Sequence, residues 1–300
     1  MVHTIFQTTG LRVKKLSLNN KIFHKVSPRH YHKGFISRQH YFSNFLKNDR
    51  NIDIYLPPTY KHNHRKHYPV VYMHDGNNLF YPSISFGGVP WHVDHTIDKL
   101  TNNNLMDEII VVGIHNTPGR DYEYTWTQMR TRHGFQGGGG NLYAKFITEE
   151  LKPFIDNNFR TLSDRNNTSV IGSSLGGLIS FYLGLYCPHI FSMVGMISPS
   201  LWWGNGIPFK HVDQISNTLN IWIDMGTKEG YYRGIDRNMN IMSIRFMRKK
   251  LLERGFHDGY NLAYFEDKGG MHNEYSWGKR LHLPLLFFFG KRKNLIFTRN

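Results

Sequence analysis

Residues 169–177 read Ser-Val-Ile-Gly-Ser-Ser-Leu-Gly-Gly, and an apolar, helix-like run from Leu178 to Leu185 follows them. This order predicts a strand, a sharp turn with Ser174 at its apex, and a helix. Such a turn holds its serine in a strained backbone conformation that exposes the hydroxyl, and the flanking glycines remove side chains that would collide with the strand and the helix. The positions of the glycines favour Ser174 over Ser173 as the serine at the apex. A glycine lies two residues before and two residues after Ser174, whereas a motif centred on Ser173 would need glycine where Ile171 stands.

Other apolar runs predict the remaining strands of a sheet. We expect strands at 52–56, 68–73, 108–114, 169–171, 193–197, 219–225 and 262–265. Most of these runs are continuously apolar, as strands covered on both faces are, whereas 52–56 alternates like a half-exposed strand. Helices are expected from Asn141, its N-cap, to a kink or end at Pro153, and over 239–254 and 277–289. Strands alternating with helices predict an α/β fold, a mostly parallel central sheet flanked by helices on both faces.

Length and composition fit one such domain. The chain has 300 residues, 40% of them hydrophobic, and we expect a basic N-terminal arm or hairpin over 1–46, the α/β domain over 47–290 and a basic tail over 291–300. The longest apolar run, 281–289, is too short to span a bilayer, and no secretory signal is apparent, so a soluble, cytoplasmic protein is expected. The single cysteine, Cys187, excludes an internal disulfide.

The formal charge of +15 is the strongest compositional bias. It is compatible with nucleic acid, an anionic membrane or an anionic substrate, but the basic residues are scattered in short clusters and accompany no nucleic-acid motif. We therefore expect neither a nucleic-acid nor a membrane partner. The histidines at 62, 64 and 67 lack the second ligand cluster that a structural zinc site needs, and no metal or cofactor is expected.

A serine hydroxyl becomes a nucleophile when a base takes its proton and an acid orients that base. In a parallel sheet these groups lie on loops at the carboxyl ends of strands. After the expected strand 219–225 comes Glu229 in a glycine-flanked loop, and after the last strand comes His272. We favour Glu229 as the acid and His272 as the base, in the order Ser, acid, His that α/β-hydrolases use. Asp224 competes for the acid's role, and Asp267 is a further alternative.

An oxyanion formed on attack needs two N–H donors, because developing charge in a partly dry pocket is costly when unpaired. The backbone N–H of Leu175 is one candidate, and Gly76 or Asn77, after an early strand, provides the other. Trp202 and Trp203 are candidates for an aromatic wall around a planar acyl group, although one of them is equally explained as core. Arg120 is a candidate substrate-binding residue, and it lies with Arg130 and Arg132 in a segment suited to act as a lid.

Together these stretches resemble the esterase family of α/β-hydrolases that includes enterochelin and other siderophore esterases, feruloyl esterases and esterase D. The resemblance rests on residues 53–58, 68–80, 91–94, 137–156, 171–177, 198–203, 226–230 and 272–274. It implies the α/β-hydrolase fold, with Ser174 as nucleophile, Glu229 as acid and His272 as base, in agreement with the residue-level argument. Asn77, His92 and Asn141 depart from the residues usual in the family.

The expected function is a serine carboxylic-ester hydrolase that forms an acyl-enzyme and acts on a small or aromatic acyl ester, a small-molecule substrate. An acyltransferase with the same triad differs only in the final acceptor. From another class, a basic, non-catalytic polyanion-binding protein is the alternative that the charge alone suggests.

Overall fold

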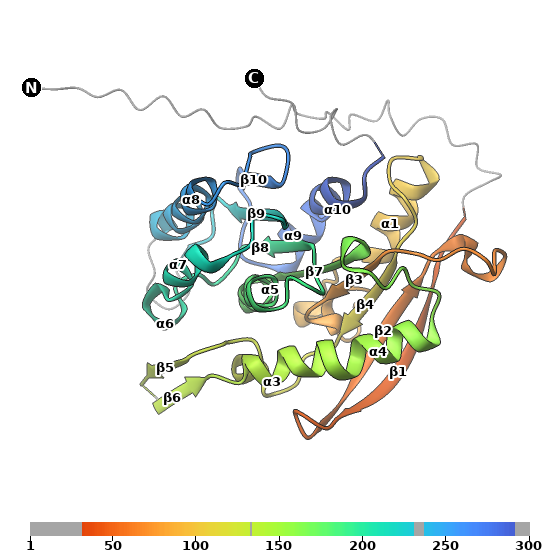
Figure 1. Ribbon diagram of the computed structural model, residues 1–300, viewed down its shortest axis with the longest axis horizontal. Coiled ribbons are helices and arrows are strands. Elements are labelled where there is room, and N and C mark those ends of the chain that lie inside the picture. Colours follow the sequence, from red (N-terminus) through yellow and green to blue (C-terminus); the bar gives the residue numbers. More distant parts are fainter. Residues whose placement is uncertain (1–31, 133, 231–236, 292–300) are drawn as a thin grey trace, which may run out of the picture.

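The computed structural model describes residues 32–132, 134–230 and 237–291 (Figure 1). Most of the expected N-terminal arm and nearly all of the expected tail lie outside the described residues. Within them, none of the helices combines the length and the apolar character needed to cross a membrane.

An eight-stranded sheet forms the centre of the molecule (Figure 1). Its strands are β1 (Phe35–Ser43), β2 (Asn48–Leu56), β3 (Val70–Met73), β4 (Ile110–Ile114), β7 (Thr168–Ser173), β8 (Met193–Ile197), β9 (Asn220–Gly226) and β10 (Leu262–Asp267). They lie in the order β1-β2-β4-β3-β7-β8-β9-β10. From β4 to β10 neighbouring strands are parallel, while β1 pairs with β2 and β2 with β4 in antiparallel fashion. The predicted mostly parallel α/β sheet is confirmed.

The first hairpin differs from its sequence-based description in two ways. Strand β1 lies within the segment expected to be an arm or hairpin and pairs with β2, so the main sheet already begins at Phe35. The expectation of a half-exposed strand at 52–56 was wrong, because every residue from Ile52 to Leu56 is buried. Asp53, the charged residue among them, is fully buried. Its carboxylate accepts two hydrogen bonds from Arg38, at 2.6 and 2.7 Å, and lies 2.8 Å from His115 Nε2.

Helices cover both faces of the sheet. They are α1 (Val93–Asn102), α2 (Arg120–Glu123), α3 (Gly140–Lys145), α4 (Lys152–Asn158), α5 (Leu175–Tyr186), α6 (Trp203–Gly206), α7 (Pro208–His211), α8 (Arg237–Glu253), α9 (Glu274–Arg280) and α10 (His282–Phe289). One core lies between the sheet and α3, α4, α5 and α8, and the other between the sheet and α1, α9 and α10. Successive residues of β3 alternate between the two cores, as period-two side chains must. A separate hairpin, β5 (Gln128–Thr131) and β6 (Gly134–Gly137), stands apart from the main sheet.

The helix after the glycine run differs from expectation at its N-cap, and of the two outcomes expected at Pro153, a kink or an end, the end did not occur. Gly139, rather than Asn141, occupies the N-cap position, and no side chain caps this end. Pro153 does not end the helix, because the chain stays helical from Gly140 through a π-helical segment, Phe146–Leu151, to Asn158. A local change of helical register of this kind is one way in which a helix accommodates an irregularity such as a proline.

The sheet topology brings distant loops to one edge. Strand β7 lies between β3 and β8, and β9 follows β8. In register, Ser173 lies beside Ile197 and Ile197 beside Asp224. The residues that follow these parallel strands therefore meet at the carboxyl edge, where α/β sheets place their ligand sites.

Candidate active site

The turn after β7 has the strained geometry that the sequence predicts. Ser174 has φ 57° and ψ −121°, and its backbone N–H donates to the Ile197 carbonyl at 3.0 Å. Positive φ is costly for a residue with a Cβ and concentrates at functional positions. A Cβ on Gly172 would lie 2.6 Å from the Gly176 backbone, so this turn requires glycine where β7 and α5 approach each other.

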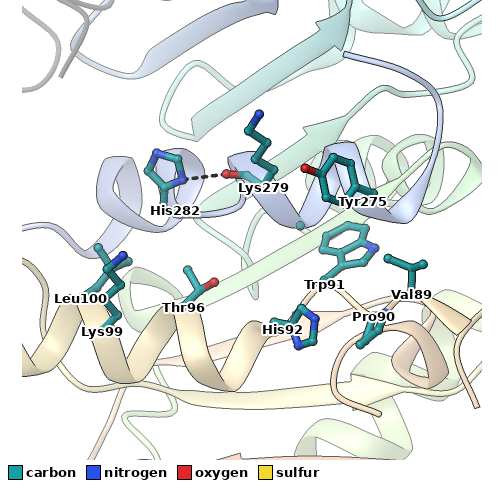
Figure 2. Close-up of a pocket in the computed structure, with 11 residues that line it drawn as sticks. Val89, Pro90, Trp91, His92, Thr96, Lys99, Leu100, Tyr275, Lys279 and His282 are labelled. Atoms are coloured by element: carbon teal, nitrogen blue, oxygen red, sulfur yellow. Dashed lines mark hydrogen bonds between the residues drawn. The ribbon is translucent and has the colours of Figure 1, made fainter. Parts of the chain in front are cut away.

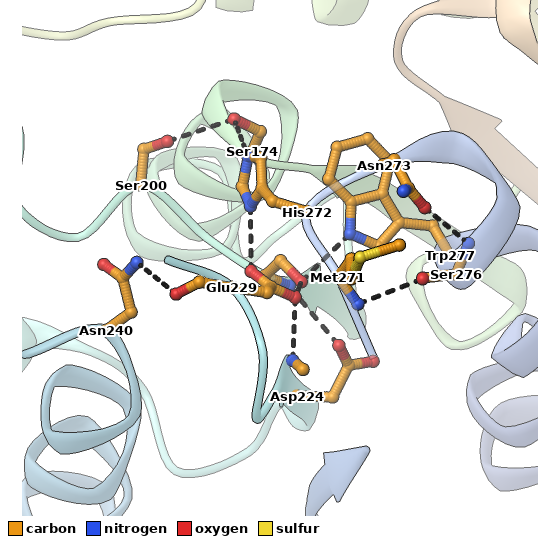
Figure 3. A network of polar contacts seen from close by, with 12 residues as sticks. Ser174, Ser200, Asp224, Glu229, Asn240, Met271, His272, Asn273, Ser276 and Trp277 are labelled. Carbon is orange, nitrogen blue, oxygen red and sulfur yellow. Dashed lines mark hydrogen bonds and ion pairs between the residues drawn. The ribbon is translucent and has the colours of Figure 1, made fainter. Parts of the chain in front are cut away.

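Ser174, His272 and Glu229 form one chain of hydrogen bonds (Figure 3). The Ser174 Oγ lies 3.0 Å from His272 Nε2, and His272 Nδ1 lies 2.8 Å from Glu229 Oε2. Glu229 follows β9 and is 1% exposed, while His272 follows β10 with 31% of its side chain exposed. When Nδ1–H donates to Glu229, Nε2 is free to accept the serine proton, which is the arrangement that a general base needs.

Glu229 is held in its ionised form. Burial would raise the pKa of the Glu229 carboxyl, but hydrogen bonding and charge from His272, a hydrogen bond from Ser198 and the positive charge of Arg280 together lower this pKa below its ordinary value. The Ser198 Oγ donates to Oε1 at 2.5 Å and the Gly226 N–H donates at 2.7 Å. A fixed negative charge is therefore available to stabilise an imidazolium.

The competing acids serve a different partner. Asp224 accepts from Arg280 at 2.8 Å and from the indole N–H of Trp222 at 2.7 Å. Asp267 lies 3.2 Å from the same guanidinium. Burial raises the pKa of the Asp224 carboxyl, and Arg280 opposes that rise. Both carboxylates hold Arg280 behind Glu229, and it is Glu229 that contacts the imidazole.

The residues that hold Glu229 and His272 in place were not identified from the sequence. The Ser198 Oγ accepts hydrogen bonds from Trp277 Nε1 at 3.0 Å and from Arg280 Nη2 at 2.6 Å while donating to Glu229. The Trp277 ring stands edge-on to the His272 ring, with centroids 4.8 Å apart. A polar residue directly after a buried strand was the one signal that pointed to Ser198. Ser200 was also missed, and its Oγ lies 3.2 Å from Ser174 Oγ.

The two candidates for the second oxyanion donor occupy different surroundings. Asn77 lines the same cleft as Ser174 and Leu175. Gly76 instead packs against β4, where an added Cβ would lie 2.5 Å from the Gly113 carbonyl. Among the described residues, neither the Asn77 N–H nor the Leu175 N–H donates to an acceptor. Asp75, in the same loop, binds Arg120 through two hydrogen bonds of 2.7 and 2.8 Å.

A cleft of about 820 Å³ opens above Ser174, a size typical of small-ligand sites. Trp202 and Trp203 both line it, but Trp203 is 1% exposed and donates its indole N–H to the Thr127 carbonyl, so it is mainly a core residue. Arg120 lines the cleft while paired with Asp75. Arg130 and Arg132 are exposed at the β5–β6 hairpin and are not among the residues that line it.

A second cavity, of about 500 Å³, lies between α1 and the α9–α10 pair (Figure 2). Trp91, His92, Tyr275 and His282 are among its lining residues, and it shares none with the cleft. Burial lowers the pKa of the His282 imidazole. No site residue predicted from the sequence lines this cavity. Within the part of the chain that the structure describes, no three His, Cys, Asp or Glu side chains gather so as to hold a metal ion.

Known proteins with similar sequences include esterases. The chain is 28% identical over 253 residues to the uncharacterized protein YbbA of Bacillus subtilis (strain 168), a match that covers 83% of this chain and 96% of YbbA. It is 24% identical over 187 residues to the ferri-bacillibactin esterase BesA of the same organism, covering 55% of this chain and 62% of BesA.

The fold and the family follow from two further comparisons. A crystal structure of the enterobactin esterase FES from Shigella flexneri superposes with a TM-score of 0.67 at 19% identity, covering 85% of this chain and 58% of that one. The central sheet and its helices are therefore those of the esterase α/β-hydrolases. A family model described as "Putative esterase" matches residues 43–288, which include Ser174, Glu229 and His272. The chain belongs to this esterase family.

Proposed function

We propose that the protein is a serine carboxylic-ester hydrolase that acts through an acyl-enzyme on esters of small or aromatic acyl groups. The observation that carries this proposal is the contact chain from Ser174 Oγ through His272 to Glu229, at a strained turn that opens into a cleft. Membership of the esterase family supports the same class of reaction.

In the proposed reaction, Ser174 Oγ attacks the ester carbonyl carbon while its proton passes to His272 Nε2. The N–H groups of Leu175 and Asn77 donate to the oxyanion, and Glu229 stabilises the imidazolium. The intermediate collapses as the C–O bond breaks, and the leaving alcohol takes the proton from His272. A water molecule then gives a proton to His272 and attacks the acyl carbon; the bond from that carbon to Ser174 Oγ breaks, and His272 returns the proton to Oγ, which releases the acid and restores the serine.

The cleft offers an aromatic acyl group an aromatic neighbour. Trp202 is half-buried and stands beside Trp203, with ring centroids 5.8 Å apart. A planar acyl group stacked on Trp202 would gain both buried area and ring contact. By their names, a ferri-bacillibactin esterase and an enterobactin esterase are among the proteins similar to this chain.

Ser174→Ala tests the function. It should lower kcat for p-nitrophenyl acetate by at least about 10³-fold, because the nucleophile is gone, and should abolish labelling by a fluorophosphonate probe. Ser173→Ala is the matched control, since it removes a hydroxyl one residue away in β7, and it should keep both turnover and labelling. Retained turnover in Ser174→Ala, with the circular dichroism spectrum unchanged, would reject the assignment.

A further inference from the structure

The charge of the cleft differs from that of the chain. The whole sequence carries a formal charge of +15. The described residues that line the cleft nevertheless include four carboxylates, Asp75, Asp121, Glu229 and Glu274, against two permanent cations, Arg120 and Lys228. The site is therefore locally acidic within a strongly basic protein, and this local field is the one that a bound ester experiences.

Pairing removes three of these six charges from the count, while Asp121, Lys228 and Glu274 form no ion pair with the described residues. Asp75 and Arg120 neutralise each other through two hydrogen bonds. Glu229 is engaged by His272 and Arg280 beneath the cleft. Of Asp121, Lys228 and Glu274, it is Glu274 that burial affects most, and no Lys, Arg or His side chain of the described residues forms an ion pair with it. Its contact is a hydrogen bond from the Asn78 side-chain amide to Oε1, at 2.8 Å.

Glu274 is poised to respond to a ligand's charge. Burial and the negative charge of Asp75 raise the pKa of the Glu274 carboxyl to about 7, against smaller lowering effects from Arg120 and Asn78. A half-buried carboxylate without a cation is a costly arrangement, and a cation brought by the ligand would relieve that cost. The aromatic side chains of Phe86 and Trp202 also line the cleft and suit an alkylammonium group.

The position of Glu274 points to the leaving group. It lies two residues after His272, and its partner Asn78 follows the oxyanion candidate Asn77. His272 must hand its proton to the departing oxygen, so the alcohol half of the ester lies on the histidine side of the scissile carbonyl. Glu274 lines the same cleft as Ser174 and His272, and it is the carboxylate that we assign to the alcohol half.

We propose that Glu274 makes this cleft select esters whose leaving group carries a positively charged ammonium, and reject esters whose leaving group is anionic. The inference rests on the proposed ester hydrolysis and adds a substrate class to it. Glu274 acts here as a specificity-determining residue, and it takes no part in the bond-making steps.

Three thioesters of acetate test the selection, because their thiol products are measured in the same assay. They are acetylthiocholine, its uncharged tert-butyl isostere, and the acetyl thioester of mercaptoethanesulfonate. At pH 8 we expect kcat/KM for acetylthiocholine to exceed that of the isostere by about tenfold, and the sulfonate to fall below the isostere by a similar factor. Glu274→Gln, which keeps an acceptor for Asn78, should bring both ratios close to one. Glu274→Asp should retain the order.

The pH dependence gives a second readout. The cation-to-isostere ratio should rise as pH increases through about 7 and Glu274 becomes charged. Asp75 and Arg120 stay paired through their two hydrogen bonds over this range. In Glu274→Gln the ratio should not change with pH. The control Glu253→Gln removes one exposed negative charge on α8 and should leave the wild-type ratios.

The outcomes separate the two proposals. If the isostere is hydrolysed and Ser174→Ala abolishes this, ester hydrolysis stands; a wild-type enzyme that then treats the three thioesters alike, or a Glu274→Gln variant that keeps the wild-type ratios, overturns the role of Glu274. If no ester is hydrolysed and no probe labels Ser174, the proposed function fails and this inference fails with it. Should Glu274→Gln not fold, Glu274→Asp and the wild-type pH profile of the ratio still decide.

Discussion

Glu229 and Asp224 are two buried carboxylates behind one serine, and their hydrogen-bond partners give them different tasks. Glu229 reaches the imidazole of His272, and Asp224 holds the guanidinium of Arg280. Ser198 joins the two groups, because its hydroxyl contacts Glu229 and Arg280 together. The Glu229 carboxylate next to the His272 imidazole thus sits on a supporting network that fixes its position.

Substituting each carboxylate by its amide separates these tasks. Glu229→Gln should lower kcat for p-nitrophenyl acetate by roughly 10³–10⁴-fold, because an amide cannot fix the imidazole tautomer or stabilise the imidazolium. Asp224→Asn should lower the free energy of unfolding by roughly 3 kcal/mol, because Arg280 loses a buried partner, and should change kcat by less than about tenfold. Steady-state kinetics and urea unfolding measure both. An Asp224→Asn variant as inactive as Glu229→Gln would make Asp224 the functional acid.

At the scale of elements, the sequence predicted where the strands lie better than it predicted which of their residues are buried and what those residues contact. The apolar runs at 108–114 and 193–197 lie in β4 and β8 because both faces of these strands are buried and admit few polar residues. The alternation at 52–56 was misleading, because Asp53 meets its partner Arg38 only after β1 folds onto β2. A local pattern cannot reveal a cross-strand ion pair.

The β1–β2 hairpin offers a test of that ion pair. Hydrogen bonds from Arg38 and His115 outweigh the effect of burial and lower the pKa of the Asp53 carboxyl. Asp53→Asn should lower the free energy of unfolding at pH 7 by about 1–3 kcal/mol, towards the lower end because Arg38 is partly exposed. Since the folded pKa is lowered, this contribution is present above the unfolded pKa of about 3.9 and is lost as pH falls below it.

Urea unfolding of the wild type and of Asp53→Asn between pH 7 and pH 3 measures the difference in their free energies of unfolding. This gap should become smaller as the pH falls. Asp49→Asn is the control on the same strand, because Asp49 is 56% exposed and pairs with His40; it should change stability by less than about 0.5 kcal/mol. A gap that widens with acid would show that Asp53 does not contribute as a carboxylate.

At the scale of the whole molecule, the site residues that the sequence revealed are those with a local sequence signal. The residues that it missed are positioned by contacts between distant parts of the chain. Ser174 and His272 were recognisable as candidates because their surroundings are local: a strand before each and glycines around them. The contacts of Ser198 with Trp277 and Arg280 span 79 and 82 residues, and no local pattern marks them. The same holds for the choice between Gly76 and Asn77, which depends on how closely β4 packs against the loop.

One sheet separates two cores, so loss of either core should unfold the whole. Phe287, 3% exposed in α10, belongs to the core beneath the sheet, opposite to the core that contains α5. Phe287→Ala should lower the free energy of unfolding by about 3–5 kcal/mol through lost burial and a cavity. Tryptophan fluorescence, circular dichroism and residual esterase activity should all report one transition, shifted to lower urea, because both cores share the strands of the same sheet.

Phe135→Ala on the β5–β6 hairpin, where the ring is 70% exposed, is the control and should leave the free energy of unfolding within about 0.5 kcal/mol of wild type. Two separated transitions, with activity surviving the first, would show that the core around α10 unfolds independently of the half that carries Ser174.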